Sequence, residues 1–251
     1  MKYPEDFINK VICGDCLEVM KDIPDKSVDM ILADLPYGTT ACKWDIIIPF
    51  DKLWEQYNRI IKDNGAIVLF GQEPFSSHLR LSNLANYRYD LYWQKERITN
   101  VFQVKRRSGK NIETISIFYK KQPTYNPQFE VYTGKKRTNK VKDGKLGSLI
   151  DANSKKVKEY CDNGLRYPTQ VIKFNRDILK SNLHPTQKPV ALLEYLIKTY
   201  TNEGDLVLDN CAGSGTTGVA CKNTNRNFIL IEKEPEYCEI ARQRLRQDTL
   251  L

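Results

Sequence analysis

The sequence of 251 residues has no apolar run that approaches the roughly 20 residues needed to cross a bilayer, which argues against an integral membrane protein. Residues 1–6, Met-Lys-Tyr-Pro-Glu-Asp, lack the apolar segment of a secretory signal, so we do not expect export. The seven cysteines are scattered and odd in number, which is typical of reduced thiols. We therefore predict a cytoplasmic protein with no membrane partner.

Histidine is also scarce, since His78 and His184 are the only two. We predict that His78 lies on the surface of a helix. Cys13-Gly14-Asp15-Cys16 has the spacing of redox and zinc sites, but zinc needs a second ligand pair and a redox thiol needs a helix N-terminus. Cys13 is expected at a strand end and the sequence offers no second pair, so we predict no metal site.

The charge that is present is unevenly distributed. Residues 94–180 hold 21 lysines and arginines against 8 acidic residues, a charge of +13, so the rest of a chain of net charge +8 carries −5. The 41% of hydrophobic residues indicates a folded protein with a sizeable core. A near-neutral body with one basic stretch is the pattern expected of a protein that binds a polyanion, although a solvated lysine-rich loop is the alternative.

Short apolar runs alternate with helical patterns, which predicts an α/β fold with a parallel sheet. The runs that we expect as buried strands are residues 28–33, 66–70, 206–208 and 228–231. Asp51 is expected to cap a helix that Asn64-Gly65 ends, and Pro189 and Pro235 are expected to open two more. Residues 87–93 and 114–119 also resemble strands. From about residue 120 to 183 the sequence shows no regular alternation of strand and helix patterns.

A strand, a glycine turn and the start of a helix follow one another over residues 206–218. Gly213-x-Gly215-x-x-Gly218 satisfies the dinucleotide fingerprint, so a nicotinamide-dependent oxidoreductase is an alternative, as is a turn that binds no ligand. Asp209 at the strand end would repel a pyrophosphate and attract an ammonium or sulfonium cation. S-adenosylmethionine carries both cations together with a ribose, which Glu232 at the end of the next strand could bind. This segment therefore favours S-adenosylmethionine.

The order of the parts is rotated, because the chain ends about 20 residues after Glu232 and the missing strands must come from the N-terminal half. Residues 10–13 can supply the strand beside the one that ends at Glu232, and Asp15 after it could accept a hydrogen bond from an adenine amine. We expect the chain to begin in the middle of the sheet.

A second site is predicted at Asp34-Leu35-Pro36-Tyr37, which follows the strand at residues 28–33 directly. Ligand sites of α/β proteins form at the carboxyl ends of parallel strands. The Asp34 carboxylate and the Leu35 carbonyl can accept both hydrogens of an exocyclic amine, and the Tyr37 ring can stack on a planar heterocycle. A plain turn is the alternative for a lone tetrapeptide.

These two sites, together with His184-Pro185-Thr186-Gln187-Lys188-Pro189, resemble the DNA amino-methyltransferases of the β-group. The resemblance covers about residues 1–93 and 183–247, while residues 94–182 match in position and basic character. It implies a circularly permuted Rossmann-like methyltransferase sheet with helices on both faces. It also implies three parts, namely a catalytic half at residues 1–93, a basic target-recognition insert at 94–182 and a cofactor-binding half at 183–251.

The resemblance implies a role for each matching position. Asp34, Leu35, Pro36 and Tyr37 would hold a flipped base. The residues implied in cofactor binding are Asp15 and Cys16 beside the adenine, Glu232 on the ribose, Asp209, Ala212, Gly213, Ser214, Gly215, Thr216 and Thr217 around the methionine part, and His184, Thr186 and Lys188 near its carboxylate, with Lys188 as counter-charge. Leu35 stands where the family usually has proline, and Ala212 where it often has an aromatic residue.

The implied reaction is methyl transfer from S-adenosylmethionine to the N6 amine of adenine in double-stranded DNA, by base flipping and in-line displacement. Transfer to the N4 amine of cytosine is the near alternative, although in the family a serine in place of Asp34 tends to accompany cytosine. RNA methylation, a nicotinamide-dependent oxidoreductase and a non-catalytic DNA-binding module are further alternatives.

The basic stretch offers candidate contacts to DNA phosphates, which position a protein without specifying a sequence. They are Lys105, Arg106, Arg107, Lys120, Lys121, Lys135, Lys136 and Arg137. Tyr119, Tyr125 and Tyr132 are interleaved with them, and we interpret Tyr119 as a buried strand residue. A homodimer is expected from the resemblance alone, and a companion restriction enzyme is left open.

Overall fold

The computed structural model describes residues 1–39, 45–134, 164–176 and 187–247. Contacts between Cα atoms divide the chain into two compact units, of which the larger comprises Met1–Asn126 and Gln170–Leu251 and the smaller Pro127–Thr169. Each unit is described by itself below.

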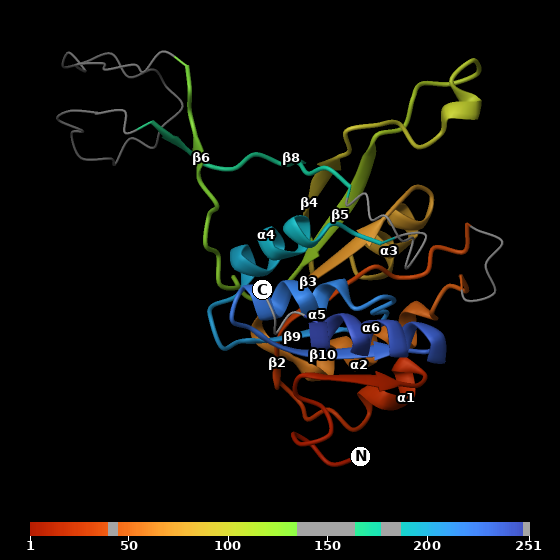
Figure 1. The fold of residues 1–251 in the computed structure, drawn as a ribbon, viewed down its shortest axis with the longest axis vertical. Coiled ribbons are helices and arrows are strands. Elements are labelled where there is room, and N and C mark those ends of the chain that lie inside the picture. Colours follow the sequence, from red (N-terminus) through yellow and green to blue (C-terminus); the bar gives the residue numbers. More distant parts are fainter. Residues whose placement is uncertain (40–44, 135–163, 177–186, 248–251) are drawn as a thin grey trace. The chain divides into compact units, whose positions relative to one another are not determined.

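The larger unit is built on an eight-stranded sheet of described residues with the order β1-β10-β9-β2-β3-β5-β4-β8 (Figure 1). The strands are β1 (Lys10–Cys13), β2 (Val28–Ala33), β3 (Ile61–Gly71), β4 (Tyr87–Gln94), β5 (Ile112–Phe118), β8 (Val171–Lys173), β9 (Leu206–Asp209) and β10 (Asn227–Glu232). Neighbouring strands are parallel except for β5, which is antiparallel to both β3 and β4. The carboxyl ends of the other strands therefore meet at one edge of the sheet, together with the amino end of β5.

Helices cover both faces of this sheet, as the sequence predicted (Figure 1). They are α1 (Cys16–Met20), α2 (Phe50–Ile60), α3 (Phe75–Ser82), α4 (Val190–Tyr200), α5 (Thr216–Asn223) and α6 (Pro235–Gln247), with a 3-10 turn, η1 (Val101–Gln103). Ile31 of β2 packs with residues of α2 and α3, whereas its neighbour Leu32 packs with residues of α4 and α5. Side chains of a strand alternate between faces, so a strand buried on both sides reads as a continuous apolar run.

The predicted strands are confirmed, and β2 has the bounds that its apolar run indicated. The predicted end of α2 is wrong, because the helix ends at Ile60 and Asn64-Gly65 lies within β3. A register shift between Val28 and Met30 of β2 accommodates the extra residues of β3 at this point. A Cβ atom at Gly65 would lie 2.8 Å from the Asp29 carbonyl oxygen, so this glycine permits a close approach of two strands and does not end a helix.

Residues 10–13 form β1, which pairs with β10 as predicted. The expectation that the chain begins in the middle of the sheet is wrong, because β1 is the edge strand. His78 lies on α3 and is exposed, which confirms the prediction for that residue. None of the helices in the described ranges is long and apolar enough to span a membrane.

The smaller unit contains a two-stranded antiparallel sheet of β6 (Glu130–Val131) and β7 (Leu165–Arg166). The Phe129 and Tyr167 rings pack with centroids 4.8 Å apart, and the Arg166 guanidinium lies 4.3 Å from the centroid of the Tyr132 ring. Residues 135–163 lie outside the described ranges.

Gly215, at the N-cap of α5, is one of two glycines with positive φ in the turn after β9, and Gly213 is the other. The φ of Gly215 is +78°, and an added Cβ would lie 2.8 Å from Cβ of Ala241 on α6. We expect Gly215→Ala to lower the free energy of unfolding by about 3 kcal/mol, since backbone strain and overlap add. Gly204→Ala is the matched control, because Gly204 has a φ of +84° and open space around it. Its free energy of unfolding should fall by only about 1 kcal/mol, since backbone strain acts there without overlap. Equal losses in chemical denaturation would contradict the contribution of Ala241.

Candidate active site

A cavity of about 550 Å³ opens at the edge of the sheet where the carboxyl ends of the parallel strands meet. This size is that of a typical small-molecule site. Of the residues that the sequence predicted, it is lined by Asp15, Cys16, Asp34, Leu35, Pro36, Tyr37, Lys188, Asp209, Ala212, Gly213, Ser214, Thr216, Thr217 and Glu232. Gly215 faces α6 instead. One cavity therefore holds both predicted sites.

Asp209 gives the cavity a buried carboxylate at the end of β9, with 5% of the residue exposed. Its oxygens accept hydrogen bonds from the Cys211 backbone N–H at 3.0 Å and the Thr217 hydroxyl at 2.5 Å. Burial raises the pKa of Asp209 to about 7 in spite of these donors. Within the described part of the chain, no lysine or arginine forms an ion pair with this carboxylate, so a cationic ligand would be attracted to it.

Two further carboxylates hold the turns around Asp209. Glu232, at the end of β10, accepts hydrogen bonds from the backbone N–H groups of Gly213 at 2.7 Å and Glu234 at 2.8 Å. Asp15 caps α1 by accepting a hydrogen bond from the Leu17 N–H at 2.9 Å. Each carboxylate keeps further acceptor capacity beside the cavity.

Asn210 and Cys211, which the sequence did not single out, also line the cavity. The Tyr57 hydroxyl donates to the Asn210 side-chain oxygen at 2.5 Å and so holds the residue after Asp209 against α2. A hydrogen bond with Cys211 lowers the pKa of Cys16, an effect that burial opposes, and the same interaction raises the pKa of Cys211.

The second half of the cavity contains Asp34 and Tyr37, directly after β2. The Tyr37 hydroxyl donates to Oδ1 of Asp34 at 2.5 Å and lies 3.3 Å from Oε1 of Glu113. The Tyr37 ring packs against Phe75 of α3 with centroids 4.9 Å apart, which fixes the plane of the ring. The carboxylate of Asp45 accepts hydrogen bonds from the backbone N–H groups of Gly38 at 2.8 Å and Thr39 at 2.9 Å, and so holds the turn after Tyr37.

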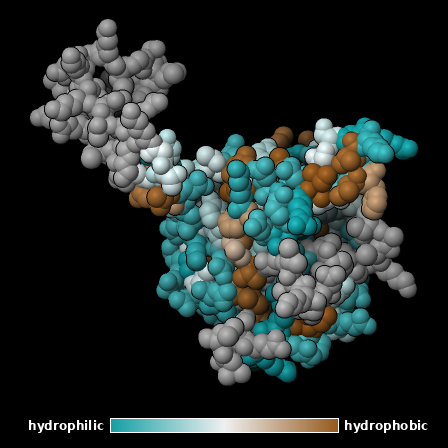
Figure 2. Space-filling view, turned by 45° about the horizontal axis from the view of Figure 1, so that its top comes forward, coloured by the Kyte–Doolittle hydropathy of each residue, from teal (hydrophilic) through white to brown (hydrophobic). Residues whose placement is uncertain are grey.

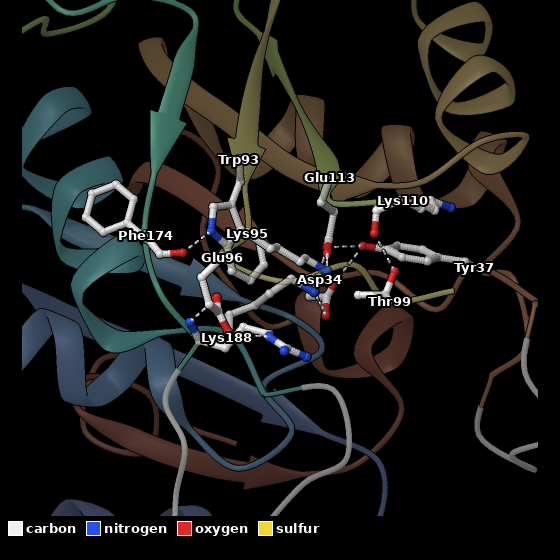
Figure 3. Close-up of polar contacts among 11 residues, drawn as sticks. Asp34, Tyr37, Trp93, Lys95, Glu96, Thr99, Lys110, Glu113, Phe174 and Lys188 are labelled. Carbon is white, nitrogen blue, oxygen red and sulfur yellow. Dashed lines mark hydrogen bonds and ion pairs between the residues drawn. The ribbon is translucent and has the colours of Figure 1, made fainter. Parts of the chain in front are cut away.

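Four charged side chains alternate in sign through this half of the cavity (Figure 3). Nζ of Lys188 lies 2.6 Å from Oδ2 of Asp34 and 2.8 Å from Oε1 of Glu113, and Nζ of Lys95 lies 2.6 Å from Oε2 of Glu113. The side chains of both lysines and of Glu113 are at most 11% exposed, whereas that of Asp34 is 25% exposed. We call these four residues the charge network. Its two carboxylates and two ammonium groups balance one another.

The pKa values follow from this arrangement. Burial raises the pKa of Asp34, and the Lys188 ammonium opposes that shift. Burial alone would also raise the pKa of Glu113, but two lysines outweigh it and hold this pKa at about 2. Burial would lower the pKa of Lys188, yet Asp34 and Glu113 raise it. The Lys188 cation is thus fixed between two carboxylates.

The profile of a known family, described as DNA methylase, matches residues 28–243. The chain belongs to the N6/N4 DNA methylase family. It is 32% identical over 252 residues to the DNA adenine methyltransferase YhdJ of Escherichia coli (strain K12), across 94% of this chain and 82% of that protein. The predicted family is therefore confirmed.

Solved structures agree with this assignment. The crystal structure of the M1.HpyAVI–SAM complex matches with a TM-score of 0.62 and 27% identity, over 94% of this chain and 99% of that one. The cytosine-N4-specific PvuII DNA methyltransferase matches with a TM-score of 0.67 over 93% of this chain and 85% of that one, and at 18% identity this likeness concerns the fold alone. The predicted Rossmann-like methyltransferase fold is confirmed.

The predicted DNA contacts of the methylase fall into three groups. Lys105, Arg106 and Arg107 are exposed on the segment between β4 and β5. Lys120 and Lys121 follow β5 and lie at the opposite edge of the sheet from Asp34, because β5 runs antiparallel; Nζ of Lys121 lies 3.3 Å from Asp63. Lys135, Lys136 and Arg137 lie outside the described residues, as do His184 and Thr186 of the predicted cofactor site.

Lys188 is the residue whose surroundings differ most from the expectation. The sequence suggested a counter-charge for a cofactor carboxylate, whereas its ammonium contacts Asp34 and Glu113. Glu113 and Lys95 were missed, although one signal was available. Glu113 is a lone acidic residue at the start of an apolar strand within a strongly basic stretch, and such a residue needs a buried partner.

Proposed function

We propose that this methylase transfers a methyl group from S-adenosylmethionine to the N6 amine of an adenine flipped out of double-stranded DNA. The observation that carries the proposal is that one cavity joins a buried carboxylate suited to a cation, Asp209, to a carboxylate and an aromatic ring suited to a base, Asp34 and Tyr37. A nicotinamide-dependent oxidoreductase is disfavoured because Asp209 would repel a pyrophosphate.

The residues around Asp209 fit S-adenosylmethionine, which when bound supplies an electrophilic methyl group on a sulfonium centre. Asp209 offers a negative charge that the described residues do not neutralise, Glu232 offers acceptors for a ribose diol, and Asp15 offers an acceptor for the adenine amine. Lys188 is engaged with Asp34, so we assign the recognition of the cofactor carboxylate to none of the described lysines.

Asp34 would act on the target amine as a hydrogen-bond acceptor. The lone pair of an adenine amine is delocalised into the ring, and hydrogen bonds from its N–H groups to Asp34 and the Leu35 carbonyl would localise it on nitrogen. Transfer then forms a nitrogen–carbon bond and breaks the carbon–sulfur bond, and the nitrogen loses one proton, for which Asp34 is the nearest acceptor. These residues contribute through positioning and through charge placed where the nitrogen becomes positive.

The choice of adenine rests on two observations. The family resemblance associates aspartate at position 34 with adenine, and the E. coli relative that is 32% identical is named a DNA adenine methyltransferase. Flipping the base costs a few kcal/mol, which stacking on Tyr37 would partly offset.

The test is to incubate the purified protein with S-adenosylmethionine and unmethylated bacterial DNA, digest the DNA to nucleosides and identify methylated bases by mass spectrometry. N6-methyladenine is the expected product, and long-read sequencing of the same DNA then gives the recognition sequence. N4-methylcytosine as the product would agree with the proposed mechanism but contradict the choice of adenine as the target base. If no product forms and no cofactor binds in a thermal-shift assay, the proposal is wrong.

Cofactor affinity should depend on pH through Asp209, whose pKa of about 7 lies within the working range. Below this pKa the folded protein carries a neutral carboxylic acid that attracts the sulfonium weakly, and above it a carboxylate. The dissociation constant for S-adenosylmethionine is therefore expected to fall about tenfold between pH 6 and pH 8. Isothermal titration calorimetry at several pH values measures this change.

Asp209→Asn should bind the cofactor weakly and remove most of this pH dependence. Asp205→Asn is the matched control, because Asp205 precedes the same strand and accepts a hydrogen bond from the Asn202 N–H at 2.8 Å. An unchanged pH profile in Asp209→Asn would show that another group titrates.

A further inference from the structure

The segment between β4 and β5, residues 95–111, forms an arm at the rim of the cavity. The Lys95 N–H donates to the Asn111 carbonyl and the Thr99 N–H to the Lys110 carbonyl, both at 2.7 Å, so the base of the arm continues the pairing of the two strands. Lys95 and Thr99 line the same cavity as Asp34 and Tyr37. The base of the arm therefore forms part of the cavity wall.

The tip of the arm is also held by hydrogen bonds. The Asn100 side chain donates to the Ser108 carbonyl at 3.1 Å, which ties the two sides of the arm together. Between them lies η1, where the Gln103 carbonyl accepts hydrogen bonds from the N–H groups of Arg106 and Arg107 at 2.9 and 3.0 Å. Figure 1 shows this tip, in yellow, beyond the ends of β4 and β5.

The tip presents apolar side chains that the protein leaves in solvent. Phe102 has a relative exposure of 102%, and Val101 and Val104 are 57% and 45% exposed. Figure 2 shows hydrophobic residues next to hydrophilic ones on this part of the surface. A contiguous exposed apolar patch is a marker of an interaction site. A phenylalanine without packing on a held turn therefore indicates a partner.

The charges around Phe102 indicate the kind of partner. Residues 97–110 include no acidic residue and five cations, which are Arg97, Lys105, Arg106, Arg107 and Lys110. An apolar tip followed by three consecutive exposed cations suits a polyanion that can also receive an aromatic ring. DNA fits both requirements, because its phosphates attract the cations and its base steps can admit an apolar side chain.

We propose that Phe102 is a wedge that enters the base stack beside the target nucleotide and stabilises the flipped state, while Lys105, Arg106 and Arg107 contact the flanking phosphates. This inference rests on the proposed function. Removal of a base from a duplex leaves a gap, and an aromatic ring that fills the gap recovers part of the lost stacking. Phe102 is a positioning residue, since it acts on the duplex and not on the reacting atoms.

The test compares Phe102→Ala, Phe102→Trp and the wild type on two duplexes that carry the recognition sequence found by sequencing. One duplex is fully paired and the other is mispaired at the target base, which is then already displaced at little cost. We expect Phe102→Ala to lower kcat/KM about 10- to 100-fold on the paired duplex and less than about threefold on the mispaired one. Phe102→Trp should restore activity on both.

A fluorescent signature separates a wedge from a general contact. With 2-aminopurine in place of the target base, binding of the wild type and of Phe102→Trp should raise the fluorescence, and binding of Phe102→Ala should not. Leu81→Ala, which removes an apolar side chain that is 69% exposed on α3, is the matched control and should behave as the wild type.

Several outcomes would overturn the wedge. Wild-type activity of Phe102→Ala on the paired duplex, or equal losses on both duplexes, would exclude it while the proposed function stands. Self-association of the wild type in the absence of DNA that Phe102→Ala abolishes would identify a second copy as the partner instead. If the wild type methylates no base in the bacterial DNA of the first assay, the proposed function is overturned together with the wedge.

Discussion

Replacement of Asp34 by alanine is expected to lower methyl transfer about 1,000-fold or more, while the affinity for S-adenosylmethionine changes less than about threefold. Asp34 offers the side-chain acceptor at the predicted position of the target amine, whereas the carboxylates suited to the cofactor, Asp209 and Glu232, belong to other strands. Single-turnover rates on DNA and calorimetry with the cofactor measure the two effects separately.

Two controls make this result specific. Asp63→Ala removes a carboxylate that is paired with Lys26 and Lys121 at the opposite edge of the sheet, and it should leave transfer unchanged. Asp34→Ala still leaves Lys188 paired with Glu113, so a thermal denaturation curve close to that of the wild type is expected. Turnover by Asp34→Ala at the rate of the wild type would remove Asp34 from the proposed mechanism.

One half of the site could be predicted from the sequence because its residues lie at the ends of parallel strands. Asp34, Asp209 and Glu232 come at or directly after the ends of apolar runs, and the structure confirms these runs as β2, β9 and β10. The carboxyl ends of parallel neighbours necessarily lie at one edge of a sheet, so side chains far apart in the sequence could be assigned to one cavity. Local pattern and a topological rule were sufficient here.

The direction of β5 accounts for what the sequence did not predict. Because β5 runs antiparallel, its amino end lies at the edge where the parallel strands end, which brings Glu113 to Asp34. For the same reason, Lys120 and Lys121 after its carboxyl end lie at the opposite edge. An apolar run has no feature that tells one direction from the other, since both directions bury the same faces. The partners in the charge network likewise depend on a contact between Glu113 of β5 and Lys188, two residues before α4, which no local pattern encodes.

Lys188→Met is expected to have the second largest effect, since it removes the cation that separates Asp34 from Glu113. Breaking a buried ion pair by removing one partner leaves an uncompensated charge, so the free energy of unfolding should fall by about 3–5 kcal/mol. Lys62→Met is the matched control, because Nζ of Lys62 lies 2.6 Å from Asp29 but its side chain is 40% exposed, and it should cost at most about 1 kcal/mol.

The activity of Lys188→Met should then depend on pH in a defined direction. Lys188 opposes the rise that burial causes in the pKa of Asp34, so its removal lets that pKa rise further. A larger fraction of Asp34 is then protonated at neutral pH, and a neutral carboxyl group accepts hydrogen bonds from the amine more weakly and cannot take up its proton. The acidic limb of the rate profile should therefore shift to higher pH, with activity partly recovered in alkaline buffer.

A second substitution tests whether charge balance is the cause. Lys188→Met combined with Glu113→Gln removes one charge of each sign and leaves Asp34 and Lys95, so the double variant should be more stable than Lys188→Met alone. Such recovery would be a coupling between two residues in direct contact, which a double-mutant cycle measures. The result to set against this is a loss in free energy of unfolding that equals the sum of the losses measured for Lys188→Met and Glu113→Gln alone. In that case the alternating charges of the network do not stabilise one another, and the shift in the pH profile needs another cause.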